Sequence, residues 1–239
     1  MKGFGDIQSV YRAKLELLEM MDSSAVAILN GDDPKLMLMA GAFKPRIITF
    51  GLSKGCDYRA TKITYRNRER KFLLNDLYPL KLKILGRHNI YNALAAIAVA
   101  NQLGVGYDLI KEALVNFSLS SGRMEMKELG DVRIIDDSYN SNLLSLNSAI
   151  DTLAGLAPSA RKILVSGDML ELGPAAGAAH YHMGRKVAEK GIDILITVGS
   201  LAGQMCRAAH RYGMKKQEIF ECGSHAEAGK CLLDLIRAG

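Results

Sequence analysis

The spacing of hydrophobic residues divides the first fifty positions into helices and strands. Residues 7–21 carry apolar side chains every three or four positions, which predicts an amphipathic helix. Residues 25–29 and 46–50 are short, continuous apolar runs, as is typical of buried parallel strands. Between these runs, Asn30-Gly31-Asp32-Asp33-Pro34 supplies a turn and a helix start. This order predicts a βαβ unit.

The pattern changes after residue 57. Residues 58–65, 71–74 and 80–84 alternate in polarity or are rich in β-forming residues, and polar turns separate them. They predict a small antiparallel sheet. Helical spacing returns in residues 89–103 and 107–117.

Residues 118–122, Ser-Leu-Ser-Ser-Gly, are the best candidate for a linker. Strands and helices alternate beyond it, which predicts an α/β, Rossmann-like domain over residues 119–239. The chain stops after a helical segment, where a further strand would be expected. The predicted strands are residues 132–135, 162–165, 192–198 and 218–222, and the helices between them are residues 143–154, 178–190 and 201–212.

Length and composition fit a globular protein. The 239 residues, 49% of them apolar, suffice for one large or two modest domains. No apolar run approaches the ~18 residues of a membrane span, so we expect no membrane insertion. The N-terminal residues do not resemble a signal peptide. The four cysteines show no CxxC spacing, and we expect reduced thiols in a cytoplasmic protein.

The net charge of +6 suggests an anionic ligand. Lysine and arginine are scattered along the chain, and the one dense cluster, residues 66–71, is typical of a solvated hairpin turn. We therefore expect a small anion such as a nucleotide, and no nucleic-acid partner.

Two asparagines follow the strand that ends at Gly86. Asn89 and Asn92 are three positions apart at a predicted helix start, so their amides share one helical face. An amide offers both a donor and an acceptor, which suits the edge of an adenine ring. The alternative is capping of the helix, for which asparagine is a favoured residue. The spacing alone favours capping and leaves adenine binding open.

Polar residues also follow two strands of the second domain. Asp136-Asp137-Ser138-Tyr139-Asn140-Ser141-Asn142 stands where open α/β sheets bind ligands. An acidic residue there can hold ribose hydroxyls, and Tyr139 can stack on a base; a capping turn is the alternative. Asp168 and Glu171, in Ser166-Gly167-Asp168-Met169-Leu170-Glu171-Leu172-Gly173, could bind a substrate amine or belong to an ordinary loop.

In combination these segments are specific. Their order and spacing, with Ser121-Gly122-Arg123-Met124 between them, strongly resemble the Mur ligases of peptidoglycan synthesis, and particularly the branch that adds D-alanyl-D-alanine. The likeness extends to four further segments: Gly3-Phe4-Gly5, Tyr11-Arg12-Ala13-Lys14, Leu29-Asn30-Gly31-Asp32-Asp33, and Glu171-Leu172-Gly173 with His180 seven residues after Gly173. It covers nearly all of this chain, but only about half of such an enzyme.

The resemblance implies an ATP-dependent ligase that forms a peptide bond through an acyl phosphate. Residues 1–118 would be the rear of the central, ATP-binding domain, and residues 119–239 a C-terminal domain without its last strand. The implied cofactors are ATP and Mg²⁺, and the implied substrates are a UDP-sugar peptide and D-alanyl-D-alanine. The oligomeric state is not implied.

The resemblance also assigns roles to residues. Lys14 matches a carbamylated lysine beside the metal in the family. Carbamylation would turn its side chain into an anion able to hold Mg²⁺. Without the resemblance, Lys14 would be interpreted as a solvent-facing lysine of the helix. By the same resemblance, Asn89 and Asn92 would contact adenine. Arg123 and Asp137 would hold ribose or phosphate, and Tyr139 would border the base. Contacts to the peptide substrate fall to Asn140, Asn142 and Asp168.

Several departures favour a fragment that is inactive alone. No glycine-rich phosphate-binding loop occurs; the nearest approach, Gly223 with Gly229-Lys230-Cys231, is better interpreted as the last helix. Lys2 stands where relatives usually carry an acid, and Leu143 where they carry proline. The alternatives are a neighbouring branch, such as a folylpolyglutamate synthetase or another Mur ligase, and a non-catalytic nucleotide-binding or interaction module.

Overall fold

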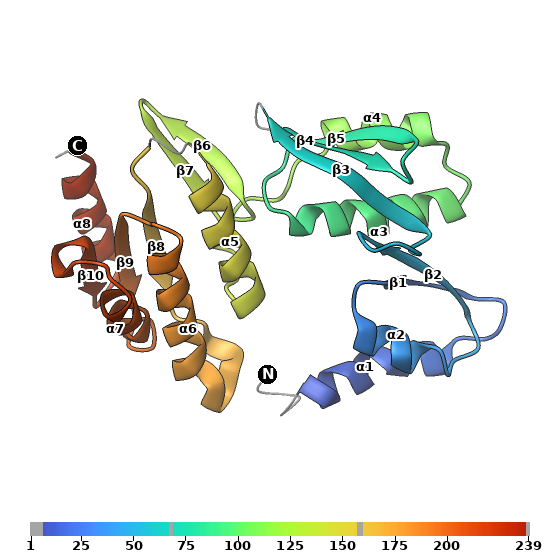
Figure 1. The fold of residues 1–239 in the computed structure, drawn as a ribbon, viewed down its shortest axis with the longest axis horizontal. Helices are drawn as coiled ribbons and strands as arrows, with labels where there is room; N and C mark the ends of the chain where they lie inside the picture. The colour runs from blue at the N-terminus through green and yellow to red at the C-terminus, as the bar shows by residue number, and fades with distance from the viewer. Residues whose placement is uncertain (1–6, 67–68, 157–159, 238–239) are drawn as a thin grey trace. The chain divides into compact units, whose positions relative to one another are not determined.

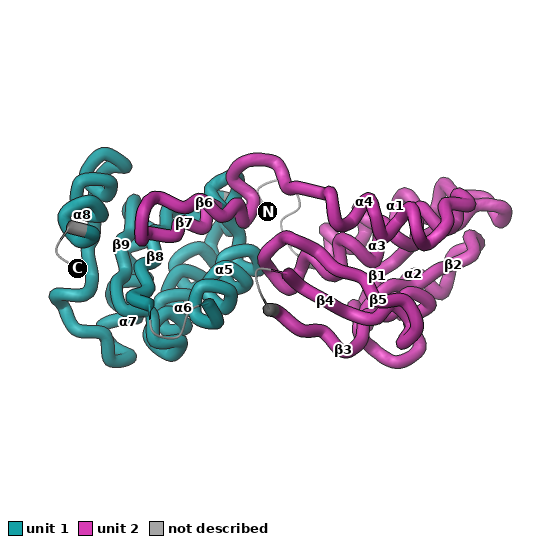
Figure 2. The backbone as a smooth tube through the Cα atoms, turned by 90° about the horizontal axis from the view of Figure 1, so that it is seen from above, with its two compact units in different colours: residues 1–3, 137–239 teal, residues 4–136 magenta. Residues whose placement is uncertain are grey.

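A computed structural model describes residues 7–66, 69–156 and 160–237. Both helices and strands occur along the whole of this length (Figure 1). The chain divides into two compact units between Asp136 and Asp137, and each unit is considered by itself (Figure 2). In chain order, the first unit is the one drawn in magenta, which ends at Asp136, and the second unit is the one drawn in teal, which begins at Asp137. The division falls later in the chain than the predicted boundary after residue 118.

The elements of the first unit follow the order that the hydrophobic spacing predicts up to residue 117, with boundaries shifted by a residue or two. They are α1 (Ile7–Met20), β1 (Val26–Asn30), α2 (Pro34–Ala40), β2 (Arg46–Gly51), β3 (Tyr58–Arg66), β4 (Glu69–Leu74), β5 (Tyr78–Leu82), α3 (His88–Gln102), α4 (Tyr107–Asn116), β6 (Glu125–Leu129) and β7 (Val132–Asp136).

Strands β1 to β5 form one sheet in sequence order. The pairs β1–β2 and β2–β3 are parallel, and the pairs β3–β4 and β4–β5 are antiparallel. The predicted antiparallel strands are thus confirmed, and the pairing of Phe50 with Tyr58 joins them to the parallel strands. Of the polar turn predicted at residues 66–71, positions 67 and 68 lie outside the described residues.

Alternation along β1 gives each face of this sheet its own helices. Val26 and Ile28 pack into the cluster that contains Ile90 and Leu94 of α3. Ala27 and Leu29 pack on the opposite face, with residues of α1 and α2. Because successive strand residues point to opposite faces, an unbroken apolar run fills both layers.

The hairpin of β6 and β7 differs from the expected parallel arrangement. Residues 132–135 do form a strand, but β7 pairs antiparallel with β6, from Glu125 opposite Asp136 to Leu129 opposite Val132. Strand β6 was not predicted, because Glu125-Met126-Lys127-Glu128-Leu129 has little apolar content. Backbone pairing with β7 forms the hairpin, and the ion pair of Lys127 with Asp136 adds a side-chain contact across it.

The second unit contains a parallel sheet in the order β10-β9-β8. Leu195 of β9 packs in the cluster formed with α5, α6 and α7, whereas Ile194 and Ile196 pack in the cluster that includes α8. The elements are α5 (Leu143–Gly155), β8 (Ile163–Gly167), the 3₁₀ helix η1 (Leu170–Ala175), α6 (Ala176–Glu189), β9 (Ile194–Val198), α7 (Gly203–Arg211), the 3₁₀ helix η2 (Lys216–Glu218), β10 (Ile219–Cys222) and α8 (His225–Arg237).

Among the residues that the structure describes, no helix is long and apolar enough to cross a membrane. Lys2 and Gly3-Phe4-Gly5, which entered the family comparison, lie outside the described residues.

Candidate nucleotide and substrate site

The first turn of α3 carries the two asparagines proposed to contact adenine. Gly86 precedes it with a positive φ of 84°, and a Cβ atom there would collide with the ring of His88. Asn89 is 2% exposed; its Nδ2 donates to the carbonyl of Leu85 at 2.5 Å. Nδ2 of Asn92 donates to Oδ1 of Asn89 at 3.0 Å. The two amides therefore do share one face; Asn89 also anchors the turn, and Asn92 is exposed to solvent.

The same turn is tied to the sheet through Asp32. Tyr91, between the two asparagines, donates its hydroxyl to Oδ2 of Asp32 at 2.7 Å. Asp32 follows β1, and its carboxylate also accepts from the backbone N–H groups of Leu52 (2.7 Å) and Ser53 (3.0 Å), just after β2. The start of α3 thus lies at the carboxyl ends of β1 and β2, where α/β sheets bind ligands.

Lys14 is exposed on α1. One turn earlier, Tyr11 donates its hydroxyl to the carboxylate of Asp33 at 3.1 Å. Asp33 caps α2 by accepting from the N–H of Leu36 at 2.9 Å. These bonds hold α1 near the end of β1, but no group of three or more His, Cys, Asp or Glu residues in the described parts of the chain could hold a metal ion. The residues described do not by themselves fit a Mg²⁺ site at Lys14.

Asp168, proposed to contact the peptide substrate, has a structural role in the second unit. Its Oδ1 accepts from the N–H of Ala202 at 2.7 Å, just before α7. Gly199 has a φ of 108°, and a Cβ atom there would lie 2.5 Å from the carboxyl carbon of Asp168. The carboxylate is partly exposed and fills the space that Gly199 leaves.

His180 fixes the residue beside Asp168. It is fully buried, and its Nε2 accepts from the N–H of Met169 at 2.9 Å while Nδ1 lies 2.7 Å from the carbonyl of Ala176. Donation from Nδ1 to that carbonyl assigns a neutral imidazole with the proton on Nδ1. The sequence marked His180 only through the family likeness, and this bond gives the physical reason for the residue.

The segment before α5 supplies the other predicted contacts. Asn142 caps α5: its Oδ1 accepts from the N–H groups of Leu144 (3.0 Å) and Ser145 (2.9 Å). Tyr139 is 67% exposed and Asn140 is also exposed. Asp137 is partly buried. The geometry at Asn142 is therefore that of a helix cap, which was the alternative to ligand binding in this segment.

Predicted contacts thus fall in both units. Arg123, Asn89, Asn92 and Lys14 belong to the first unit. The second unit contains Asp137, Tyr139, Asn140, Asn142 and Asp168. Arg123 is exposed, two residues before β6.

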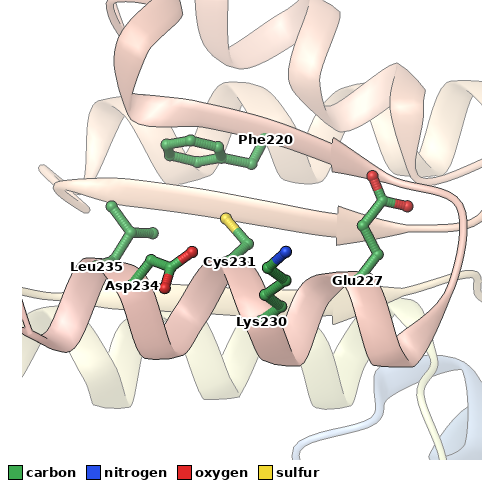
Figure 3. Close-up of a pocket in the computed structure, with 6 residues that line it drawn as sticks. All are labelled: Phe220, Glu227, Lys230, Cys231, Asp234 and Leu235. Atoms are coloured by element: carbon green, nitrogen blue, oxygen red, sulfur yellow. The ribbon is translucent and has the colours of Figure 1, made fainter.

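Two grooves in the described surface are lined by other residues. One groove, of about 410 Å³, lies between β10 and α8 (Figure 3). Lys230 and Cys231, considered above as a remote match to a phosphate-binding loop, lie in the middle of α8. Backbone N–H groups inside a helix bond to carbonyls four residues back and cannot cradle a phosphate, so the interpretation as a helix is confirmed. The residues that line the groove are Phe220, Glu227, Lys230, Cys231, Asp234 and Leu235.

The chain thus contains two α/β units, and the first places an asparagine-bearing helix start at the carboxyl ends of parallel strands, where α/β proteins bind ligands. The chain belongs to the Mur ligase family: residues 1–100 match the Mur ligase middle domain, and residues 122–239 match the Mur ligase, glutamate ligase domain. Within that family it is similar to UDP-N-acetylmuramoyl-tripeptide–D-alanyl-D-alanine ligases. The Escherichia coli enzyme of that name is 33% identical over 205 residues, which are 83% of this chain and 45% of the relative.

Solved structures agree with this assignment. MurF from Acinetobacter baumannii is 29% identical, with a TM-score of 0.84 over 98% of this chain and 50% of that one. MurF from Thermotoga maritima, solved in complex with ADP, is 21% identical and shares the fold, with a TM-score of 0.82 over 97% of this chain and 52% of that one. The chain spans about half the length of the curated relatives it matches.

Proposed function

We propose that this chain forms the adenine-binding and amine-binding half of an ATP-dependent ligase of peptidoglycan synthesis. The reaction would join D-alanyl-D-alanine to UDP-N-acetylmuramoyl tripeptide. ATP would phosphorylate the tripeptide carboxylate, and the dipeptide amine would then displace phosphate from the acyl phosphate. Two observations support this proposal. Both Mur ligase domains match the chain, and the first turn of α3 exposes Asn92 to solvent.

The proposed nucleotide contacts of the first unit are the start of α3 and Arg123, and those of the second unit are Asp137 and Tyr139. Asn92 would read the adenine edge while Asn89 holds the turn. Arg123 and Asp137 would contact ribose or phosphate, and the exposed ring of Tyr139 would border the base. The ADP in the Thermotoga maritima structure supports a nucleotide as the ligand.

The peptide side is assigned to Asn140 and Asp168, with Asn142 shaping the loop as a helix cap. Asp168 would attract the ammonium group of D-alanyl-D-alanine with its partly exposed carboxylate. A carbamylated Lys14 would offer one anionic ligand to Mg²⁺. Because the described residues add no cluster of further ligands, the remaining ligands would have to come from elsewhere. The cytoplasmic location and the domain boundary after residue 118 stay predictions.

A ligation assay tests the proposal directly. The 239-residue chain is incubated with UDP-N-acetylmuramoyl tripeptide, D-alanyl-D-alanine, ATP and Mg²⁺, and pentapeptide and released phosphate are measured. We expect no turnover by these residues alone, because their sequence contains no glycine-rich phosphate-binding motif. ADP binding is measured in parallel by calorimetry, with Asn92→Ala as the variant and Asn116→Ala, at the far end of the neighbouring helix α4, as the matched control. Binding that Asn92→Ala does not weaken would contradict the adenine assignment.

A second candidate is a non-catalytic nucleotide-binding module. Lys2, at a position where relatives usually carry an acid, favours it. Supplying the preceding half of a related ligase as a separate polypeptide distinguishes the two. Restored ligation indicates half of an enzyme, whereas ADP binding without ligation indicates the module.

A further inference from the structure

The carboxylate of Asp32 connects three segments that are distant in sequence. It follows β1, accepts two backbone N–H groups from Leu52 and Ser53 after β2, and accepts the hydroxyl of Tyr91 from α3, 59 residues away. Oδ1 of Asn30 accepts from the N–H of Asp32 itself at 3.0 Å, which fixes the backbone at this point.

Close packing leaves the carboxylate little freedom. A Cβ atom on Gly51 would lie 2.8 Å from the carboxyl carbon of Asp32, and one on Gly31 would lie 2.7 Å from the sulfur of Cys56. A side chain at either glycine would therefore push aside the Asp32 carboxylate or the Cys56 thiol, and glycine at both positions leaves room for these groups.

Electrostatics keep Asp32 ionised and Tyr91 neutral. Burial opposes ionisation of Asp32, but hydrogen bonds from Ser53, Leu52 and Tyr91 outweigh it and lower its pKa to about 2. Burial and the negative charge of Asp32 raise the pKa of Tyr91 to about 12. At neutral pH the contact is a phenol donating to a carboxylate, and hydrogen bonds to charged groups are the stronger class.

We propose that Asp32 and Tyr91 are a positioning pair that sets the first turn of α3 against the ends of β1 and β2. Tyr91 lies in the same helical turn, two residues after Asn89 and directly before Asn92, so any rotation of the turn that breaks its bond to Asp32 also displaces both amides. The pair is therefore a determinant of nucleotide affinity that does not itself touch the nucleotide. The link to affinity rests on the proposed function; the placement of the turn does not.

The substitution Tyr91→Phe removes one hydroxyl from this pair. Its matched control is Tyr58→Phe: the Tyr58 hydroxyl donates to Oδ1 of Asn101 at 2.7 Å and accepts from Gln102 at 3.1 Å, at the other end of α3. Both variants lose a bonded hydroxyl that holds the same helix. The probes are ADP binding by calorimetry and amide hydrogen exchange read peptide by peptide.

We expect Tyr91→Phe to weaken ADP binding about fivefold or more, the effect of a lost hydrogen bond to a charged group, while Tyr58→Phe changes it less than about twofold. Exchange should accelerate in Tyr91→Phe at residues 86–92 and 51–53, and in Tyr58→Phe only near the end of α3. Equal effects of both variants on affinity would overturn the proposal, because they would indicate general loosening of the helix.

The outcomes separate this proposal from the function on which it rests. If the unsubstituted chain does not bind ADP, nucleotide binding by this chain is refuted, and hydrogen exchange alone decides the positioning role. Unchanged exchange at residues 86–92 in Tyr91→Phe then overturns it.

A spectroscopic measurement adds a third readout. The Tyr91 ring resonance, assigned by its loss in Tyr91→Phe, should titrate well above an ordinary tyrosine, and Asp32→Asn should lower that pKa. An unchanged pKa in a folded Asp32→Asn variant would mean that the two side chains do not interact.

Discussion

At the scale of single residues, several polar side chains marked as site candidates are also structural. The side-chain amide of Asn89 donates to the carbonyl of Leu85, and Asn142 caps α5. The carboxylate of Asp168 accepts a hydrogen bond from the N–H of Ala202. Asn92, Tyr139 and Asn140 are exposed and remain the better candidates for direct ligand contact. A polar residue at the end of a strand can orient a loop or bind a ligand, and only its bonding partners distinguish the two.

The two asparagines before α5 test this distinction. Asn142→Ala removes the cap and should lower the free energy of unfolding by about 1 kcal/mol. Asn140→Ala, two residues earlier and exposed, should leave stability unchanged within about 0.5 kcal/mol. Chemical denaturation of both variants gives the comparison. Equal losses would show that Asn142 is not the cap of α5.

At the scale of elements, the closest packing in the second unit is between α6 and α7. A Cβ atom on Gly184 of α6 would lie 2.5 Å from the Cα atom of Met205 in α7. Gly229 of α8 also lies within a helix, but a Cβ atom there would meet nothing within 4 Å. Close packing thus requires glycine at position 184, whereas the space around position 229 would accept a larger side chain.

Matched alanine substitutions should move stability in opposite directions. Gly184→Ala forces α6 away from α7 and should destabilise the second unit by about 3 kcal/mol, toward the upper end of overpacking costs. Gly229→Ala should stabilise it by about 0.5–1 kcal/mol, because alanine loses less backbone entropy in a helix. Thermal and chemical unfolding measure both. A tolerated Gly184→Ala would contradict the close crossing of these helices.

At the scale of the whole molecule, the position of the domain boundary is open to a direct test. No helix or strand lies between Asn116 and Glu125, and Ser118, Ser120 and Ser121 are exposed. Exposed segments without regular hydrogen bonding are the preferred sites of nicking. Limited proteolysis should therefore cut first within residues 118–122 and leave a resistant C-terminal product. A first cut near Asp136–Asp137 would place the boundary at the division of the two compact units instead.

Much of the fold was predictable because its signals are local. The helical spacing of residues 7–21 and the apolar runs at residues 25–29 and 46–50 each specify an element without reference to the rest of the chain. The shared face of Asn89 and Asn92 followed from helix geometry in the same way. Strand β6 was not predicted from the sequence, because its residues are mostly charged and polar and its stability comes from pairing with β7.

The sequence by itself determined the order of helices and strands other than β6, the family, and the positions of the asparagine and aspartate motifs, since each of these depends on adjacent residues. Tertiary structure decided which polar residues work together. In the sequence, Asp32 is predicted only to belong to a turn. The fold brings Tyr91, 59 residues away, into hydrogen-bonding contact with it. Gly184 and Gly229 are likewise indistinguishable in sequence and are separated only by what lies opposite them. Long-range contacts depend on how whole elements pack, and no local pattern encodes that packing.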